Sequence, residues 1–163
     1  MATNFYLREL TKVIGRDIGL PIGNIRKGIF ITNAVLCMKP GAMNAPHPSA
    51  CVKNCGDRSL KPLIDLIRPK AIVTLGVVPT MSVLGLYANL DPELAVLRRS
   101  ALRDVFSKVP INLNSCRPRL FPMYHPSRLG QMGRERAEPS GSNGWELMKS
   151  DRLQMSAIVN LVR

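Results

Sequence analysis

The sequence predicts a three-layer α/β/α fold around a short, mostly parallel central sheet. Three short runs of apolar, β-forming residues lie at residues 28–36, 71–76 and 120–124. Longer segments with the apolar spacing of helices separate these runs. Strands that alternate with helices are joined by right-handed crossovers, which make the strands parallel. The 163 residues, 45% of them hydrophobic, are enough for one domain with a core of ordinary size.

The first half of the chain is expected to contain two helices and a strand before the second apolar run. An amphipathic helix is expected over residues 4–14 because its apolar side chains repeat at helical spacing. The run at residues 28–36 is apolar enough for a strand buried on both faces. A long helix is expected over residues 50–67, and Gly56 and Pro62 are expected to kink or break it.

The second half is expected to continue the alternation. A helix follows the second strand, starting after Pro79 and reaching Ala88, and another is expected over residues 97–106. The third strand, at residues 120–124, follows it.

The chain is predicted to hold one main domain and a terminal helix. Residues 1–138 form the α/β domain, and residues 139–144, rich in proline, serine and glycine, form a linker. Residues 145–163 form a C-terminal helix.

Basic residues are concentrated in one part of the chain. The whole sequence has 23 lysines and arginines against 11 acidic residues, a net charge of +12. Residues 97–136 contain nine of the basic residues and two acidic ones. Such an excess favours a polyanionic partner, nucleic acid first, although a solvated basic surface without a partner has the same composition.

One stretch combines this charge with a rigid turn. His125 follows the third apolar run and is followed by Pro126, which pushes it towards extended geometry at the end of a strand. Ser127 can cap the helix that follows, and Arg128 comes next. The ends of strands are where an open α/β sheet places its ligand-binding groups. Taken alone, the stretch also fits a strand exit with an exposed histidine.

Two residues of the other strands are further candidates. Asn33 lies among apolar neighbours, and its amide has the donor and acceptor needed to read the edge of a base. It could equally cap a neighbouring loop. Gly76 closes the second strand and could let a phosphate approach the backbone, or could simply form the turn into the helix.

Three motifs together resemble one family. The stretches ITNAVLC (residues 31–37), IVTLG (72–76) and YHPS (124–127) are similar, in order and spacing, to successive motifs of the uracil-DNA glycosylase superfamily. The closest resemblance is to the branch related to its iron–sulfur members, and it covers about residues 3–130. It implies an enzyme of base excision repair that flips a uracil out of DNA and hydrolyses its N-glycosidic bond. In it, Asn33 would read the uracil edge, and His125 would donate towards the carbonyl that gains charge.

The resemblance also implies which residues contact DNA. Pro126, Ser127 and Arg128 would press into the minor groove or hold the backbone. Gly76 and Pro46 would lie near phosphates.

The sequence departs from the family pattern at its beginning. Family members have an earlier glycine-rich motif, at the end of the first, central strand, that positions the attacking water. No such stretch precedes Phe5, so we expect an N-terminally shortened member whose first strand is missing. Two classes of function stay open: a glycosylase, impaired by this truncation or not, and a basic DNA-binding α/β module without catalysis.

The four cysteines are the candidate metal ligands. Cys51 and Cys55 lie four residues apart on one helix face, and Cys37 and Cys116 lie elsewhere. Four cysteines can hold an iron–sulfur cluster, but buried free thiols are the commoner use of cysteine, so we expect no cofactor.

The expected setting is the cytoplasm. No apolar run reaches the length needed to span a bilayer, and no secretory signal is apparent. We expect a monomer whose partner is uracil-containing DNA, with no membrane association.

Overall fold

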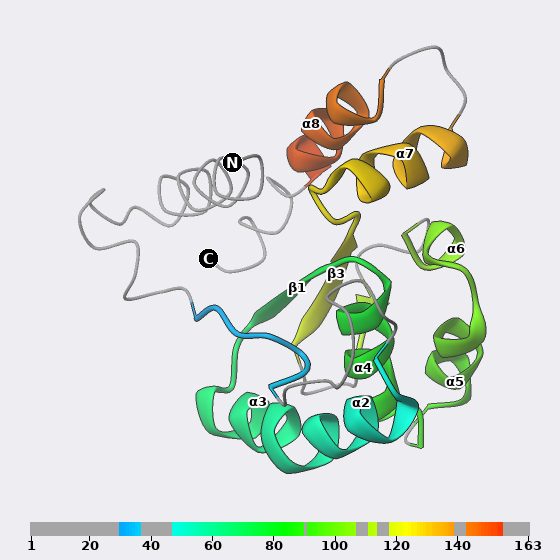
Figure 1. Ribbon diagram of the computed structural model, residues 1–163. Helices are drawn as coiled ribbons and strands as arrows, with labels where there is room; N and C mark the ends of the chain where they lie inside the picture. Colours follow the sequence, from blue (N-terminus) through cyan, green and yellow to red (C-terminus); the bar gives the residue numbers. More distant parts are fainter. Residues whose placement is uncertain are drawn as a thin grey trace. The chain divides into compact units, whose positions relative to one another are not determined.

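The computed structural model describes residues 30–36, 47–89, 91–106, 111–113, 118–138 and 143–154. Figure 1 shows the elements in chain order: α2 (Ser49–Cys55), the π-helical turn η2 (Gly56–Leu60), α3 (Lys61–Ile67), β1 (Ala71–Leu75), α4 (Val77–Tyr87), α5 (Pro92–Arg99), α6 (Leu102–Phe106), β2 (Ile111–Asn112), β3 (Arg119–Met123), α7 (Arg128–Ala137) and α8 (Gly144–Gln154). The helix expected over residues 4–14 lies outside the described residues.

The chain divides into two compact units. Residues 32–122 form the first, here called the sheet unit, and residues 1–31 with 123–163 form the second, here called the hairpin unit. The described part of the hairpin unit consists mainly of the turn after β3 and the two helices α7 and α8, which pack against each other.

The sheet confirms the predicted α/β class. Its strand order is β1-β3-β2. β1 and β3 run in the same direction (Figure 1), and the Arg119 N–H at the start of β3 donates to the Lys70 carbonyl just before β1, at 3.1 Å. The short β2 is antiparallel to β3, with Ile111 opposite Leu120. The described sheet is therefore small and mostly parallel, as expected.

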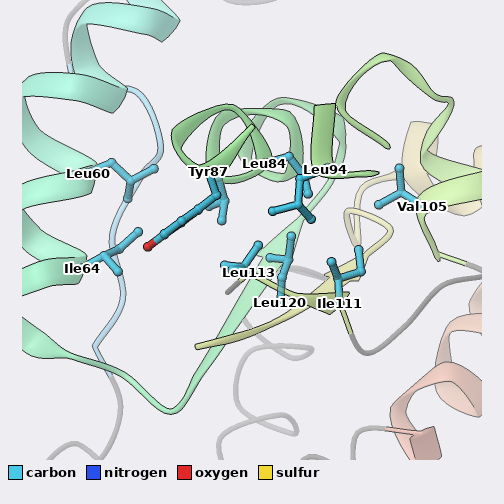
Figure 2. Close-up of a cluster of buried hydrophobic side chains, with 10 residues drawn as sticks. Leu60, Ile64, Leu84, Tyr87, Leu94, Val105, Ile111, Leu113 and Leu120 are labelled. Carbon is cyan, nitrogen blue, oxygen red and sulfur yellow. The ribbon is translucent and has the colours of Figure 1, made fainter. Parts of the chain in front are cut away.

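The core of the sheet unit is built around α4. This helix contacts β1, the helical segment α2–η2, and α5. Figure 2 shows side chains from α4, from η2 and α3, and from α5, β2 and β3 converging, with the Tyr87 ring reaching from α4 towards Ile64 of α3. The buried cluster consists of Leu60, Ile64, Val83, Leu84, Tyr87, Leu94, Val105, Ile111, Leu113 and Leu120. Burial of each of these side chains stabilises the fold by roughly 1.5–3 kcal/mol before entropy is counted.

The long helix before β1 has no break, and a π-helical turn lies where a kink or break was expected. Its middle turn, η2, is π-helical, and Pro62 lies in the first turn of α3 immediately after it. A wider turn gives the proline ring room beside the carbonyl of the preceding turn. The helix packs against α4 at Gly56, where an added Cβ would lie 3.4 Å from the Leu86 side chain.

Two predicted helix boundaries were wrong. α4 begins at Val77, so Pro79 lies inside its first turn, where its missing N–H has no helical acceptor. The helix expected over residues 97–106 is two helices, α5 and α6. The first of them starts earlier because the Asp91 carboxylate accepts from the Glu93 N–H at 2.8 Å and caps it.

The predicted strand at residues 28–36 was also wrong in its described part. Residues 30–36 form no strand, and Phe30, Ile31 and Leu36 are exposed. A strand exists only where another strand accepts its hydrogen bonds, and the described sheet order does not include this segment. An apolar run alone was therefore insufficient.

None of the described helices is long and apolar enough to cross a membrane. α8 (Gly144–Gln154) covers residues 145–154 of the expected C-terminal helix, and residues 155–163 lie outside the described part.

Candidate active site

The turn between β3 and α7 is held by its own hydrogen bonds. The Ser127 hydroxyl caps α7 by accepting from the Gly130 N–H at 3.4 Å. The Gln131 side-chain amide donates to the Pro126 carbonyl at 3.1 Å, from one turn further along the helix. The strand end, the turn and the first turns of α7 therefore form one local structure around His125, as the proline and serine predicted.

The geometry of this turn selects one tautomer of His125. The backbone N–H of Ser127 donates to Nδ1 of the imidazole at 3.1 Å. A nitrogen that accepts a hydrogen bond carries no proton, so the proton of the neutral ring lies on Nε2. The half-buried ring therefore offers an N–H donor on its far side. A fixed donor of this kind can stabilise negative charge that develops on a nearby oxygen.

Arg134 lies on the face of α7 that packs against Tyr124. Its guanidinium carbon lies 5.9 Å from the centre of the Tyr124 ring. It donates to both carboxylate oxygens of Asp151 in α8, at 2.8 and 2.9 Å, and to Glu138 at 2.8 Å. The hydrogen bonds that Arg134 donates to Asp151, more than the one to Glu138, raise the pKa of the Arg134 guanidinium further above its usual value. The side chain thus stays charged although it is buried.

The exposed side chains of the turn differ from those expected. The ring of Pro126 is fully buried, whereas Arg128 and Leu129 are exposed. Leu129 is 80% exposed in the first turn of α7. Sequence reasoning missed this residue, although a large apolar side chain two positions after the serine cap was a visible signal. An exposed apolar side chain beside a basic one suits insertion between DNA bases.

Gly76 forms the turn from β1 into α4. Its φ of 95° lies in the region that favours glycine, and it is the N-cap of α4. Its carbonyl accepts from the Thr80 hydroxyl at 2.7 Å, and that hydroxyl is also hydrogen-bonded to the Thr74 hydroxyl at 2.8 Å. Gly76 therefore has a structural role in the turn. It is followed by the first backbone N–H groups of α4, an 11-residue helix, and such groups have no acceptor within their own helix.

Asn33 is exposed rather than buried among apolar neighbours. It lies in the non-strand segment of residues 30–36, just before Ala34, which packs against the core of the sheet unit. Asn33 and Gly76 belong to the sheet unit, whereas His125 and Arg128 belong to the hairpin unit.

The remaining candidates are described only in part. Cys51 is half-buried and Cys55 is buried, and neither forms a disulfide. Cys37, Cys116 and Pro46 lie outside the described residues. Within the described ranges no three or more His, Cys, Asp or Glu side chains form a group that could hold a metal ion.

Five arginines of the basic stretch are exposed and, among the residues that the structure describes, form no ion pair: Arg98, Arg99, Arg103, Arg128 and Arg136. Two of them line a hollow of about 300 Å³ between the end of α4 and α5, together with Ala88, Asn89 and Ala95. The guanidinium of Arg98 lies on Gly85 of α4, where a Cβ would come within 3.0 Å of its Nε. Two exposed arginines thus border the hollow.

The comparison with protein families finds a match over most of the chain. The model of the uracil DNA glycosylase superfamily matches residues 6–149, which is most of the chain. No curated protein and no solved structure matches the chain significantly.

Proposed function

Because the chain belongs to the uracil DNA glycosylase superfamily, we propose that it binds DNA as a monomer and hydrolyses the N-glycosidic bond of a flipped-out uracil. The observation that carries the proposal is the hydrogen bond from the Ser127 N–H to Nδ1 of His125. It makes Nε2 a donor in the neutral ring. When the base departs, negative charge develops on a uracil carbonyl oxygen, and a donor already oriented towards it lowers the barrier.

Other residues have supporting roles in this proposal. Asn33 reads the uracil edge, since its exposed amide has both a donor and an acceptor. Leu129 enters the base stack in place of the flipped nucleotide, and Arg128 beside it contacts a phosphate. Gly76 lies where a phosphate can approach the N-terminus of α4. No cofactor has a step in this reaction.

The test is cleavage of a uracil-containing oligonucleotide by the full chain and by His125→Ala, with DNA affinity measured in parallel. Removal of one such donor is expected to lower the cleavage rate by about 100- to 1000-fold. DNA affinity should change little. An unchanged rate in the variant would show that His125 does not have this role.

The chain offers a matched control for this test. His47-Pro48-Ser49 repeats the same tripeptide before α2, where His47 is exposed and no side chain caps the helix. His47→Ala should keep the cleavage rate. Equal losses in the two variants would indicate a general effect of removing a histidine from this protein.

A DNA-binding module without catalysis is the second candidate function. The exposed arginines without ion pairs in the described part of the chain favour it, because phosphate contacts need no activated water. If the chain binds DNA but cuts neither single- nor double-stranded uracil DNA, this second function is the correct one.

A further inference from the structure

Arg134 differs from the other arginines of the basic stretch. Its side chain is 8% exposed, whereas Arg128 and Arg136 in the same helix are exposed. Its Nε and Nη2 donate to two carboxylates of the protein, Asp151 and Glu138. Because this guanidinium is buried and donates to carboxylates of the protein, its role lies inside the protein.

The guanidinium connects α8 to the residue before His125. The bidentate pair with Asp151 bridges 17 residues and joins α7 to α8. On its other side Arg134 lies over the Tyr124 ring, and α7 also packs against this ring at Gly133, where a Cβ would make an ordinary contact at 3.6 Å. Tyr124 is buried and directly precedes His125. The position of the imidazole therefore depends on how firmly this ring is held.

We propose that the Arg134–Asp151 ion pair positions His125. Asp151 of α8 holds Arg134, and Arg134 in turn holds the Tyr124 ring and the turn that contains the histidine. This inference rests on the proposed function, in which His125 is the catalytic donor. Arg134 is then a positioning residue and not a DNA contact. Asp151 lies beyond residue 149, where the family match ends, so the matched region alone does not contain this pair.

Two carboxylates bind the same guanidinium, and this allows a sharp comparison. Asp151→Asn removes the charge that connects the two helices, whereas Glu138→Gln removes a partner four residues away on the C-cap of α7. Glu138 is 55% exposed, so its loss is largely compensated by water. A third variant, Asp65→Asn, breaks the exposed Lys61–Asp65 pair in the sheet unit and serves as the unrelated control.

The first readout is the nitrogen NMR spectrum of the His125 ring at a pH where the ring is neutral. The chain has two histidines, so the His125→Ala variant identifies the signals. In the unchanged protein Nδ1 should be unprotonated and Nε2 protonated. Asp151→Asn should let the ring exchange between tautomers, while Glu138→Gln and Asp65→Asn should keep the single tautomer.

The second readout is the split between kcat and DNA affinity. A small displacement of a catalytic group lowers kcat by about 10- to 100-fold. Asp151→Asn should show a loss in this range at unchanged DNA Kd, because neither residue of the pair contacts DNA. Glu138→Gln should lose less than about threefold, the effect of a surface pair.

The outcomes separate this inference from the proposed function. If the Asp151→Asn ring keeps its single tautomer, the positioning role is wrong whether or not the protein cuts DNA. If the unchanged protein does not cut uracil DNA, the proposed function fails, and the NMR comparison still decides the positioning. Should Asp151→Asn not fold, Tyr124→Leu tests the same connection: a retained single tautomer in that variant overturns the inference.

Discussion

Two glycines three residues apart in α7 have opposite surroundings. A Cβ on Gly130 would lie 1.8 Å from the backbone oxygen of His125, whereas one on Gly133 would lie 3.6 Å from the Tyr124 ring. The first distance is impossible without a backbone shift, and the second is an ordinary contact. Gly130 therefore permits the close approach of α7 to the turn that holds the imidazole.

Alanine substitutions at these two glycines should have opposite effects on stability. Gly130→Ala should lower the free energy of unfolding by about 1–3 kcal/mol, since the turn must move. Gly133→Ala should raise it by up to about 1 kcal/mol, the gain of alanine over glycine in a helix. Urea unfolding of the two variants checks this. Equal stability of Gly130→Ala and the unchanged protein would contradict the described approach of α7 to His125.

Individual residues show where sequence reasoning succeeds and where it stops. The His125 turn was predictable because strand, proline and serine cap are all local signals. Arg134 was counted with the basic stretch, since nothing near it in the sequence reveals Asp151 as its partner. The exposure of Leu129 likewise depends on how α7 packs, which periodicity alone does not settle.

At the scale of elements, buried hydroxyl groups join β1 to α4. Thr74 in β1 and Thr80 in α4 are both buried, and their hydroxyls lie 2.8 Å apart. The Thr80 hydroxyl also donates to the Gly76 carbonyl at 2.7 Å. This bond closes the turn in which Gly76 adopts its positive φ.

Thr80→Val should lower the free energy of unfolding by about 1–3 kcal/mol. The variant keeps the shape of the side chain but leaves the Thr74 hydroxyl buried without this partner. Ser82→Ala is the control, because the Ser82 hydroxyl donates only to the Val78 carbonyl within the same helix. We expect its effect to stay within about 0.5 kcal/mol. Thermal or urea unfolding measures the stability of both variants. An equal loss of stability in the two would contradict the prediction.

Elements were predictable where local and tertiary signals agree. β1 and β3 were found close to the expected residues because short apolar runs there do pair with each other. The apolar run that includes residues 30–36 was predicted as a strand for the same reason, but its described part has no partner strand. The start of α5 was overlooked although aspartate and proline at positions 91 and 92 are a strong cap signal.

At the scale of the whole molecule, the net charge of +12 implies that DNA affinity depends strongly on salt. The structure divides the contributors by exposure. Arg98 and Arg99 line the hollow beside α4, whereas Lys61 is paired with Asp65 at 2.6 Å. A cation already paired with a carboxylate releases fewer counterions when it meets a phosphate. Arg98 and Arg99 should therefore contribute more than Lys61 to the salt dependence of DNA binding, although each carries one positive charge.

The double variant Arg98→Ser/Arg99→Ser should reduce the slope of log K against log salt by about 2, one unit for each lost phosphate contact. Lys61→Ser should leave the slope unchanged within error, because that ammonium is paired. Fluorescence titrations of one double-stranded oligonucleotide at four salt concentrations measure both slopes.

An unchanged slope in the double variant would mean that DNA does not reach the hollow. A similar decrease in Lys61→Ser would mean that DNA responds to the general field of the protein instead of to particular contacts. Only an effect confined to Arg98 and Arg99 would assign the hollow beside α4 as a DNA contact.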